Sequence, residues 1–131
     1  MANFKLDVDA DGIALITWDM PGKSMNVIDM DVVAELESHV EKVAADAAIK
    51  GAVITSGKDT FGGGADLTML EKQRTDYEAA LKSKGQEAAV TMVFERSRKL
   101  SQVYRKLETS GKPFVAALNG TAMGGDRKSV V

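Results

Sequence analysis

Two glycine-rich segments carry the residue types that can do chemistry. The first glycine turn is Phe61-Gly62-Gly63-Gly64-Ala65-Asp66-Leu67, and the second glycine turn is Asn119-Gly120-Thr121-Ala122-Met123-Gly124-Gly125. A strand that ends in small residues and turns into a helix leaves unpaired backbone N–H groups at the positive end of the helix dipole. Glycine and alanine also let a ligand approach the backbone closely. Each turn is therefore expected to attract negative charge, and two adjacent turns can point two donors at one oxygen.

Taken singly, neither turn specifies a function. No Gly-Lys-Ser/Thr follows the first, so it is not a phosphate-binding Walker loop, and neither turn has the Gly-x-Gly-x-x-Gly spacing of dinucleotide sites. A tight turn with a helix cap is the plainer interpretation of either segment alone. The two turns converge only if the apolar strands that precede them are neighbours in one sheet.

Hydrophobic patterning predicts an α/β chain in which a buried strand leads into each turn. Period-two alternation marks the opening strand, a short continuous apolar run marks each buried strand, and apolar residues at helical spacing mark the helices. The predicted elements are a hairpin of strands Phe4–Val8 and Ile13–Trp18, a helix over Asp29–Ala45, a buried strand Gly51–Thr55, a short helix Ala65–Gln73, one long or two shorter helices over Tyr77–Glu108 with Gly85 as the break, and a buried strand Phe114–Leu118.

Composition excludes several functional classes. The chain has 131 residues, 44% hydrophobic and 27% charged, with a net charge of −2 and no basic stripe for nucleic acid. There is neither a signal-peptide pattern nor a membrane-length apolar run, so a cytoplasmic protein without a membrane span is expected. Cysteine is absent and His39 is the single histidine, so no metal site is expected. His39 lies between Glu37 and Glu41 and is predicted to face solvent.

The two turns together, in this order, resemble the enoyl-CoA hydratase/isomerase (crotonase) superfamily over almost the whole chain. The resemblance implies an α/β fold, a crotonase-like spiral of ββα units, truncated here. Trp18–Gly22 and the helical segment before Ser110 are most similar to bacterial multifunctional fatty-acid oxidation proteins of the alpha-subunit type, in which a hydratase domain precedes an NAD-dependent 3-hydroxyacyl-CoA dehydrogenase domain. The matching stretches are the opening hairpin, Pro21–Ile28, Lys50–Gly57 with Phe61–Leu67, and Gly111–Gly120 with Met123–Gly125.

This resemblance implies an oxyanion hole for an acyl-CoA thioester. Ala65 and Gly125 would supply its two backbone N–H groups, while coenzyme A would bind largely through backbone groups. It also implies that this chain holds no cofactor, that coenzyme A belongs to the substrate, and that NAD is needed only if a dehydrogenase domain follows. The full-length protein would be oligomeric or in a complex with a thiolase subunit. The residues implied for coenzyme A are Ser24, Met25, Asn26, Gly64, Asp66, Leu67 and Gly124.

The sequence departs from the family pattern after the second Gly-Gly. The family continues with glycine, a variable residue and the first catalytic glutamate, whereas this chain has Lys128 at that position. Residues 126–131, Asp-Arg-Lys-Ser-Val-Val, match the translated opening of a widely used sequencing adapter. Residues 1–125 are therefore expected to be the N-terminal part of a crotonase-like domain and residues 126–131 a non-native tail. A genuine frameshift or a short paralogue is the alternative.

The sequence therefore predicts a fragment of an enoyl-CoA hydratase of fatty-acid β-oxidation, itself inactive because neither catalytic glutamate can be assigned. In the family's hydratases these glutamates act as general base and acid. Isomerisation, thioester hydrolysis and decarboxylation remain alternatives, since they use the same oxyanion hole with other acid/base residues. A non-catalytic acyl-CoA-binding module is the alternative from another class.

Overall fold

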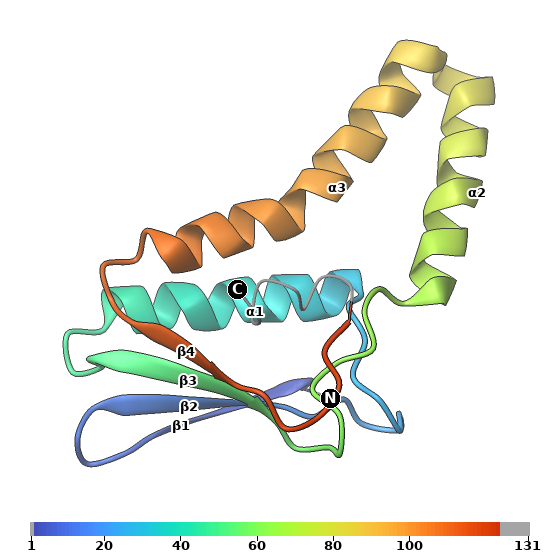
Figure 1. The fold of residues 1–131 in the computed structure, drawn as a ribbon. Coiled ribbons are helices and arrows are strands. Elements are labelled where there is room, and N and C mark those ends of the chain that lie inside the picture. The colour runs from blue at the N-terminus through green and yellow to red at the C-terminus, as the bar shows by residue number, and fades with distance from the viewer. Residues whose placement is uncertain (1, 124–131) are drawn as a thin grey trace.

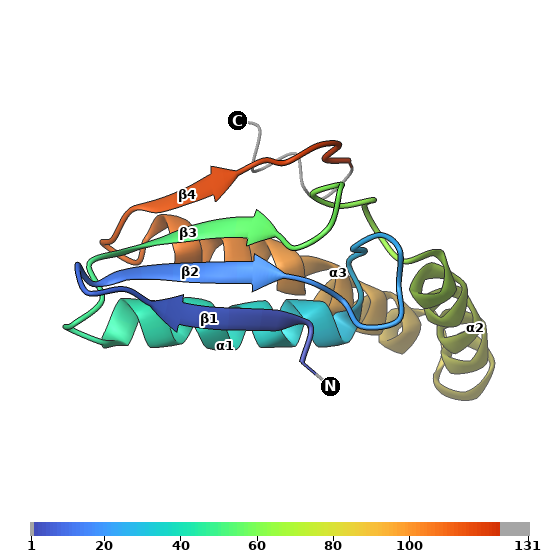
Figure 2. The ribbon, with the colours of Figure 1, turned by 90° about the horizontal axis from the view of Figure 1, so that it is seen from below.

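The hairpin predicted at the start of the chain forms one half of a four-stranded sheet. A computed structural model describes residues 2–123, with helices packed on one face of that sheet (Figures 1 and 2). The strand order is β1-β2-β3-β4; β1 and β2 are antiparallel, and β2, β3 and β4 are parallel. The elements are β1 (Phe4–Val8), β2 (Ile13–Trp18), α1 (Met30–Ala45), β3 (Gly51–Ser56), α2 (Leu67–Lys84), α3 (Gln86–Glu108) and β4 (Phe114–Ala117).

The sheet register brings the ends of β3 and β4 together. Thr55 pairs with Ala117 at the last rung, and the Thr55 hydroxyl donates to the Ala117 carbonyl oxygen at 2.9 Å. Parallel strands end at the same edge of a sheet, so the two glycine turns leave the sheet side by side. This arrangement confirms the expectation that the two preceding strands are neighbours.

Alternation along β2 places the core between the sheet and the helices. Ala14, Ile16 and Trp18 are buried toward the helices, whereas Leu15 lies on the opposite face and is 40% exposed. Helix α1 covers this side with an apolar stripe, as its helical spacing predicts. The buried residues of that stripe are Val32, Val33, Val40 and Val43.

Both ends of α1 are fixed by side chains. The Asp29 carboxylate accepts a hydrogen bond from the Val32 N–H at 2.8 Å, which satisfies one of the free N–H groups of the first turn. At the other end, Lys112 Nζ donates to the carbonyl oxygens of Val43 and Asp46, both at 2.6 Å. Helix α1 is therefore tied to the loop that precedes β4.

Two predictions need correction, one about where a helix ends and one about the burial of a strand. The short helix expected to end at Gln73 instead continues to Lys84 as α2, and Gly85, with φ +87°, separates it from α3 as expected. Helix α2 has no buried residue among those described, so an apolar stripe could not reveal its length. Strand β4 was expected to be buried, but it lies at the sheet edge and its Val115 is 58% exposed. No helix between residues 2 and 123 is both long and apolar enough to cross a membrane.

His39 is not a solvent-facing helix residue. Its side chain is half-buried, and its ring meets the Phe4 ring edge-on at 5.9 Å between centroids. This burial lowers the pKa of His39, which favours the neutral imidazole in the folded chain.

Candidate oxyanion site

The first glycine turn lies against the loop that follows β2. The Gly63 N–H donates to the Asn26 carbonyl oxygen at 2.7 Å, and the Ile28 N–H donates to the Gly64 carbonyl oxygen at 2.7 Å. Gly64 has φ +87°, a conformation that side chains disfavour. The turn is therefore held in place by backbone hydrogen bonds on one side.

Ala65 directs its own N–H away from this loop. Ile28 and Ala65 form a parallel bridge, in which the Asp66 N–H donates to the Ile28 carbonyl oxygen at 2.8 Å. In such a bridge the neighbours of Ala65 make the hydrogen bonds, so the Ala65 N–H points to the opposite side. Within residues 2–123 the Ala65 N–H donates no hydrogen bond, and Ala65 is exposed. It is thus a free donor on a fixed backbone.

Asp66 caps α2 immediately after this donor. Its Oδ1 accepts hydrogen bonds from the Thr68 N–H at 2.7 Å and the Met69 N–H at 3.1 Å. Its Oδ2 pairs with Lys23 Nζ at 2.8 Å. The Lys23 ammonium holds the pKa of the Asp66 carboxyl below its usual range, and Asp66 in turn raises the pKa of Lys23. The cap therefore stays ionised and ties the loop after β2 to the start of α2.

The second glycine turn is joined to the first by backbone hydrogen bonds. The N–H groups of Phe61 and Gly62 both donate to the Thr121 carbonyl oxygen, at 3.0 and 3.1 Å, and the Met123 N–H donates to the Gly62 carbonyl oxygen at 3.2 Å. The two turns are thus adjacent as far as Met123. The predicted second donor, Gly125, and the predicted binding residue Gly124 lie outside the described residues.

Asn26, expected in the coenzyme A region, is fully buried at 0% exposure. Its Oδ1 accepts from the Met20 N–H at 3.0 Å. Its Nδ2 donates to the Trp18 carbonyl oxygen at 2.8 Å, to Ser56 Oγ at 2.9 Å and to the Phe61 carbonyl oxygen at 3.3 Å. The amide of Asn26 therefore holds β2, β3 and the first glycine turn together and is not available to a ligand.

The other described residues of the predicted coenzyme A set differ in exposure. Ser24 and Met25 are exposed on the loop that precedes Asn26. Gly64 is buried, while Leu67, the first residue of α2, is 80% exposed. Of these four residues, three are thus accessible to a ligand.

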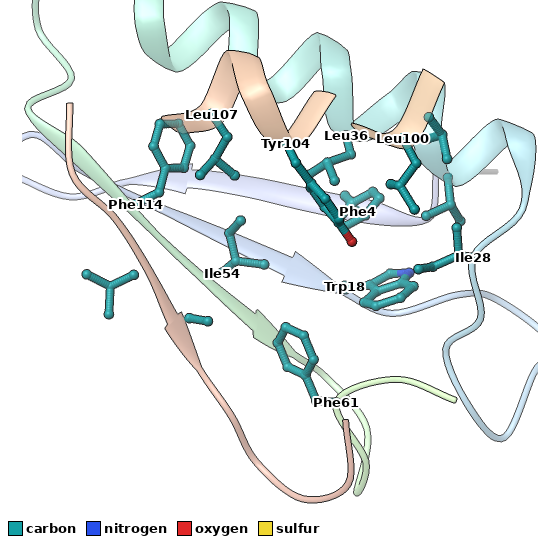
Figure 3. Close-up of a pocket in the computed structure, with 14 residues that line it drawn as sticks. Phe4, Trp18, Ile28, Leu36, Ile54, Phe61, Leu100, Tyr104, Leu107 and Phe114 are labelled. Atoms are coloured by element: carbon teal, nitrogen blue, oxygen red, sulfur yellow. The ribbon is translucent and has the colours of Figure 1, made fainter. Parts of the chain in front are cut away.

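An apolar cavity of about 390 Å³ lies behind the first turn, between the sheet and helices α1 and α3 (Figure 3). Phe61 lines this cavity, and its ring meets the Trp18 ring edge-on with 6.1 Å between the ring centroids. The Trp18 Nε1–H is buried and finds no partner within residues 2–123. Phe61 thus anchors the first turn in the core. Further walls of the cavity are formed by Phe4, Ile28, Ile54, Leu100, Tyr104 and Phe114.

Sequence reasoning missed the side chains that support both turns. Lys58 Nζ donates to the carbonyl oxygens of Met20 and Lys23, at 2.8 and 2.7 Å, and pairs with Asp19 at 2.8 Å. Nothing in the local sequence distinguishes Lys58 from a surface lysine. Asn119 opens the second turn, but its side-chain partners lie far away in the sequence.

Comparisons with known proteins identify the family and the fold. The family model of enoyl-CoA hydratase/isomerase matches residues 9–128. The chain is 37% identical over 123 residues to the fatty acid oxidation complex subunit alpha of Shewanella amazonensis and 38% identical over 127 residues to that of Shewanella frigidimarina. In both cases the match covers 93% of this chain and 15% of the relative, so the chain spans about one seventh of these relatives.

Solved structures share the fold. The enoyl-CoA hydratase of Shewanella pealeana superposes with a TM-score of 0.76 at 20% identity, over 95% of this chain and 42% of that one. An enoyl-CoA hydratase/isomerase of Marinobacter aquaeolei gives a TM-score of 0.75 at 21% identity, over 97% and 45% of the two chains. The observed α/β architecture is thus that of the crotonase fold, of which the chain covers less than half. With a family model that matches most of its length, the chain belongs to the enoyl-CoA hydratase/isomerase family.

Proposed function

We propose that this chain is the part of an enoyl-CoA hydratase of fatty-acid oxidation that binds the acyl-CoA thioester and supplies the oxyanion donors. The observation that carries the proposal is the Ala65 N–H, which is exposed, fixed by its neighbours and without a partner within residues 2–123. Its position beside the second glycine turn supports a second donor, Gly125, for the same oxygen.

The chemistry of hydration explains why two such donors are needed. Addition of water at C3 of a 2-enoyl-CoA moves negative charge through C2 onto the thioester oxygen, which becomes an enolate oxygen. Fixed N–H groups stabilise this charge without reorganisation, and the loss of one donor costs about 10²- to 10³-fold in rate. The exposed loop residues Ser24 and Met25, together with Leu67, would then contact coenzyme A around the donor.

We infer that the 131-residue chain does not itself hydrate the substrate. Lys128 occupies the position where the family has its first catalytic glutamate, and a lysine cannot act as the carboxylate base. Isomerisation and thioester hydrolysis are the second candidates, because they use the same donors and differ in acid/base residues after Gly125. The coding sequence that follows codon 125 in the source genome decides among them; a Gly-x-Glu continuation with a further glutamate supports hydration.

The names of the relatives support a wider proposal for the full-length protein. They are subunits of a fatty acid oxidation complex. We propose that the full-length protein joins a complex of this kind, with a thiolase subunit as partner and NAD bound by a separate dehydrogenase domain.

The test is a chimera in which residues 9–123 replace the aligned segment of the Shewanella amazonensis subunit alpha. This chimera is expected to hydrate crotonyl-CoA, measured as loss of enoyl absorbance, whereas the 131-residue chain is not. Ala65→Pro removes the proposed donor and is expected to lower kcat by about 10²- to 10³-fold. Ala65→Gly is the matched control, because it changes the same residue and keeps its backbone N–H.

Each outcome bears on the proposal. A folded chimera without hydratase activity contradicts the hydratase assignment, and full activity of Ala65→Pro contradicts the role of Ala65. Both variants are compared with the parent chimera by circular dichroism, so that a loss of fold is separated from a loss of the donor.

A further inference from the structure

The side chain of Asn119 joins the second glycine turn to the end of β3. Its Oδ1 accepts a hydrogen bond from the Ser56 N–H at 3.3 Å, and its Nδ2 donates to the Ser56 carbonyl oxygen at 3.0 Å. The same Nδ2 donates to the Lys58 carbonyl oxygen at 2.7 Å. The amide thus adds side-chain hydrogen bonds where backbone pairing between β3 and β4 stops.

These bonds hold residues 56–60, the connector between β3 and the first glycine turn. Within the connector, Ser56 Oγ donates to the Thr60 carbonyl oxygen at 2.7 Å and accepts from the Lys58 N–H at 2.9 Å. Gly120, with φ +120°, packs so closely on the connector backbone that a Cβ atom there would collide with the Asp59 carbonyl oxygen. The connector is therefore rigid, and Asn119 and Gly120 both hold it.

The hydrogen bonds of Asn119 matter more for the relative position of the two turns than for the stability of the fold. Asn119 is exposed, so water can replace its hydrogen bonds when the side chain is removed. What water cannot replace is the fixed spacing between the second turn and the connector.

We propose that Asn119 is a positioning residue that fixes the first oxyanion donor, Ala65, relative to the second glycine turn by clamping the connector that carries the first glycine turn. The clamp rests on observed contacts, and its catalytic meaning rests on the proposed function. Displacement of reacting groups by about 1 Å can cost about 10²-fold in rate. A side chain that fixes the position of the first glycine turn is therefore expected to affect the rate of catalysis.

The first test measures amide hydrogen exchange by NMR in the 131-residue chain. Asn119→Ala is expected to speed exchange at least tenfold at Phe61, Gly62 and Met123, whose bonds join the two turns, and to leave Ile16 in β2 within about twofold, since local opening involves only the affected segment. Asn3→Ala is the matched control, because the Asn3 side chain makes no hydrogen bond within residues 2–123. Unchanged exchange at the turns, or equal acceleration at Ile16, overturns the clamp.

The second test measures kinetics in the chimera. Asn119→Ala is expected to lower kcat about 10- to 100-fold with KM within about twofold, because misplaced donors affect the transition state and not the bound ground state. Faster exchange with an unchanged kcat overturns the positioning role. If the parent chimera is inactive, the proposed function fails, while the exchange experiment still decides whether the clamp exists.

Discussion

Replacing Asn26 with alanine tests whether one buried amide holds the loop after β2 to the first glycine turn. Asn26 is fully buried and its amide contacts four groups from three segments of the chain. Alanine removes all of these hydrogen bonds and leaves a small cavity. The perturbation therefore separates side-chain support of the turn from the backbone bond between the Gly63 N–H and the Asn26 carbonyl oxygen, which remains.

The magnitude follows from which partners lose their last hydrogen bond. The Trp18 carbonyl oxygen still accepts from the Gly57 N–H at 3.0 Å, and Ser56 Oγ keeps its bonds within the connector. The Met20 N–H and the Phe61 carbonyl oxygen lose the partner that each has within residues 2–123, and both residues are at least 97% buried. Each buried unsatisfied group costs about 1 to 3 kcal/mol, so the expected loss in the free energy of unfolding is about 2 to 6 kcal/mol.

The assay is urea unfolding followed by the fluorescence of Trp18, the single tryptophan, and by far-UV circular dichroism. Coincident transitions support two-state analysis. Asn3→Ala serves again as the matched control and is expected to change stability by no more than about 0.5 kcal/mol, the usual range for surface sites. A loss below about 1 kcal/mol for Asn26→Ala would refute the conclusion that the Asn26 amide holds β2, β3 and the first glycine turn together.

Three further predictions concern a glycine contact and two titrating groups. Gly120→Ala is expected to lower the Tm by several degrees more than Gly63→Ala. The added Cβ at Gly120 meets a backbone carbonyl at positive φ, whereas the Cβ at Gly63 meets the side chain of the partly exposed Met25. Equal shifts in Tm, measured by circular dichroism, would count against this. The pKa of Asp66 is lowered in the folded chain, so the stability that Asp66 contributes is present above about pH 4 and is lost as the pH falls through the folded pKa. Asp66→Asn is therefore expected to lower the free energy of unfolding, measured in urea, at pH 7 but not at pH 2. Burial lowers the pKa of His39, so stability is expected to fall as pH drops from about 6.5 toward 5, and His39→Gln should flatten that part of the profile; a parallel decline in both proteins would exclude His39 as its source.

Elements with a strong local pattern could be predicted from the sequence. Alternation in the hairpin and the helical stripe of α1 report burial on one face, and the structure has both at the expected positions. The end of α2 could not be predicted, because a helix without buried residues has no stripe. The exposure of β4 depends on its place at the sheet edge, which composition alone does not determine.

The sequence offered candidate donors but no sign of the side chains that support the turns. Glycines and an alanine after a strand mark a place for backbone donors in the sequence itself. Asn26 and Asn119, in contrast, act through partners 30 and 63 residues away, such as Ser56, and nothing local reveals such contacts. An asparagine in a loop is ordinarily explained by turn chemistry, so only the three-dimensional contacts separate these two from other loop residues.

The two asparagines explain how a site built from residues without side chains can be rigid. Fixing one residue's backbone costs about 1 to 2 kcal/mol, and glycine loses more conformational freedom than any other residue. An oxyanion site works only if its donors are already in place when charge develops. Asn26 holds the first glycine turn from the buried side and Asn119 holds its connector from the exposed side, both through Ser56. The amides therefore supply the order that the glycines lack, and the precision of the proposed site would depend on residues that need never touch the substrate.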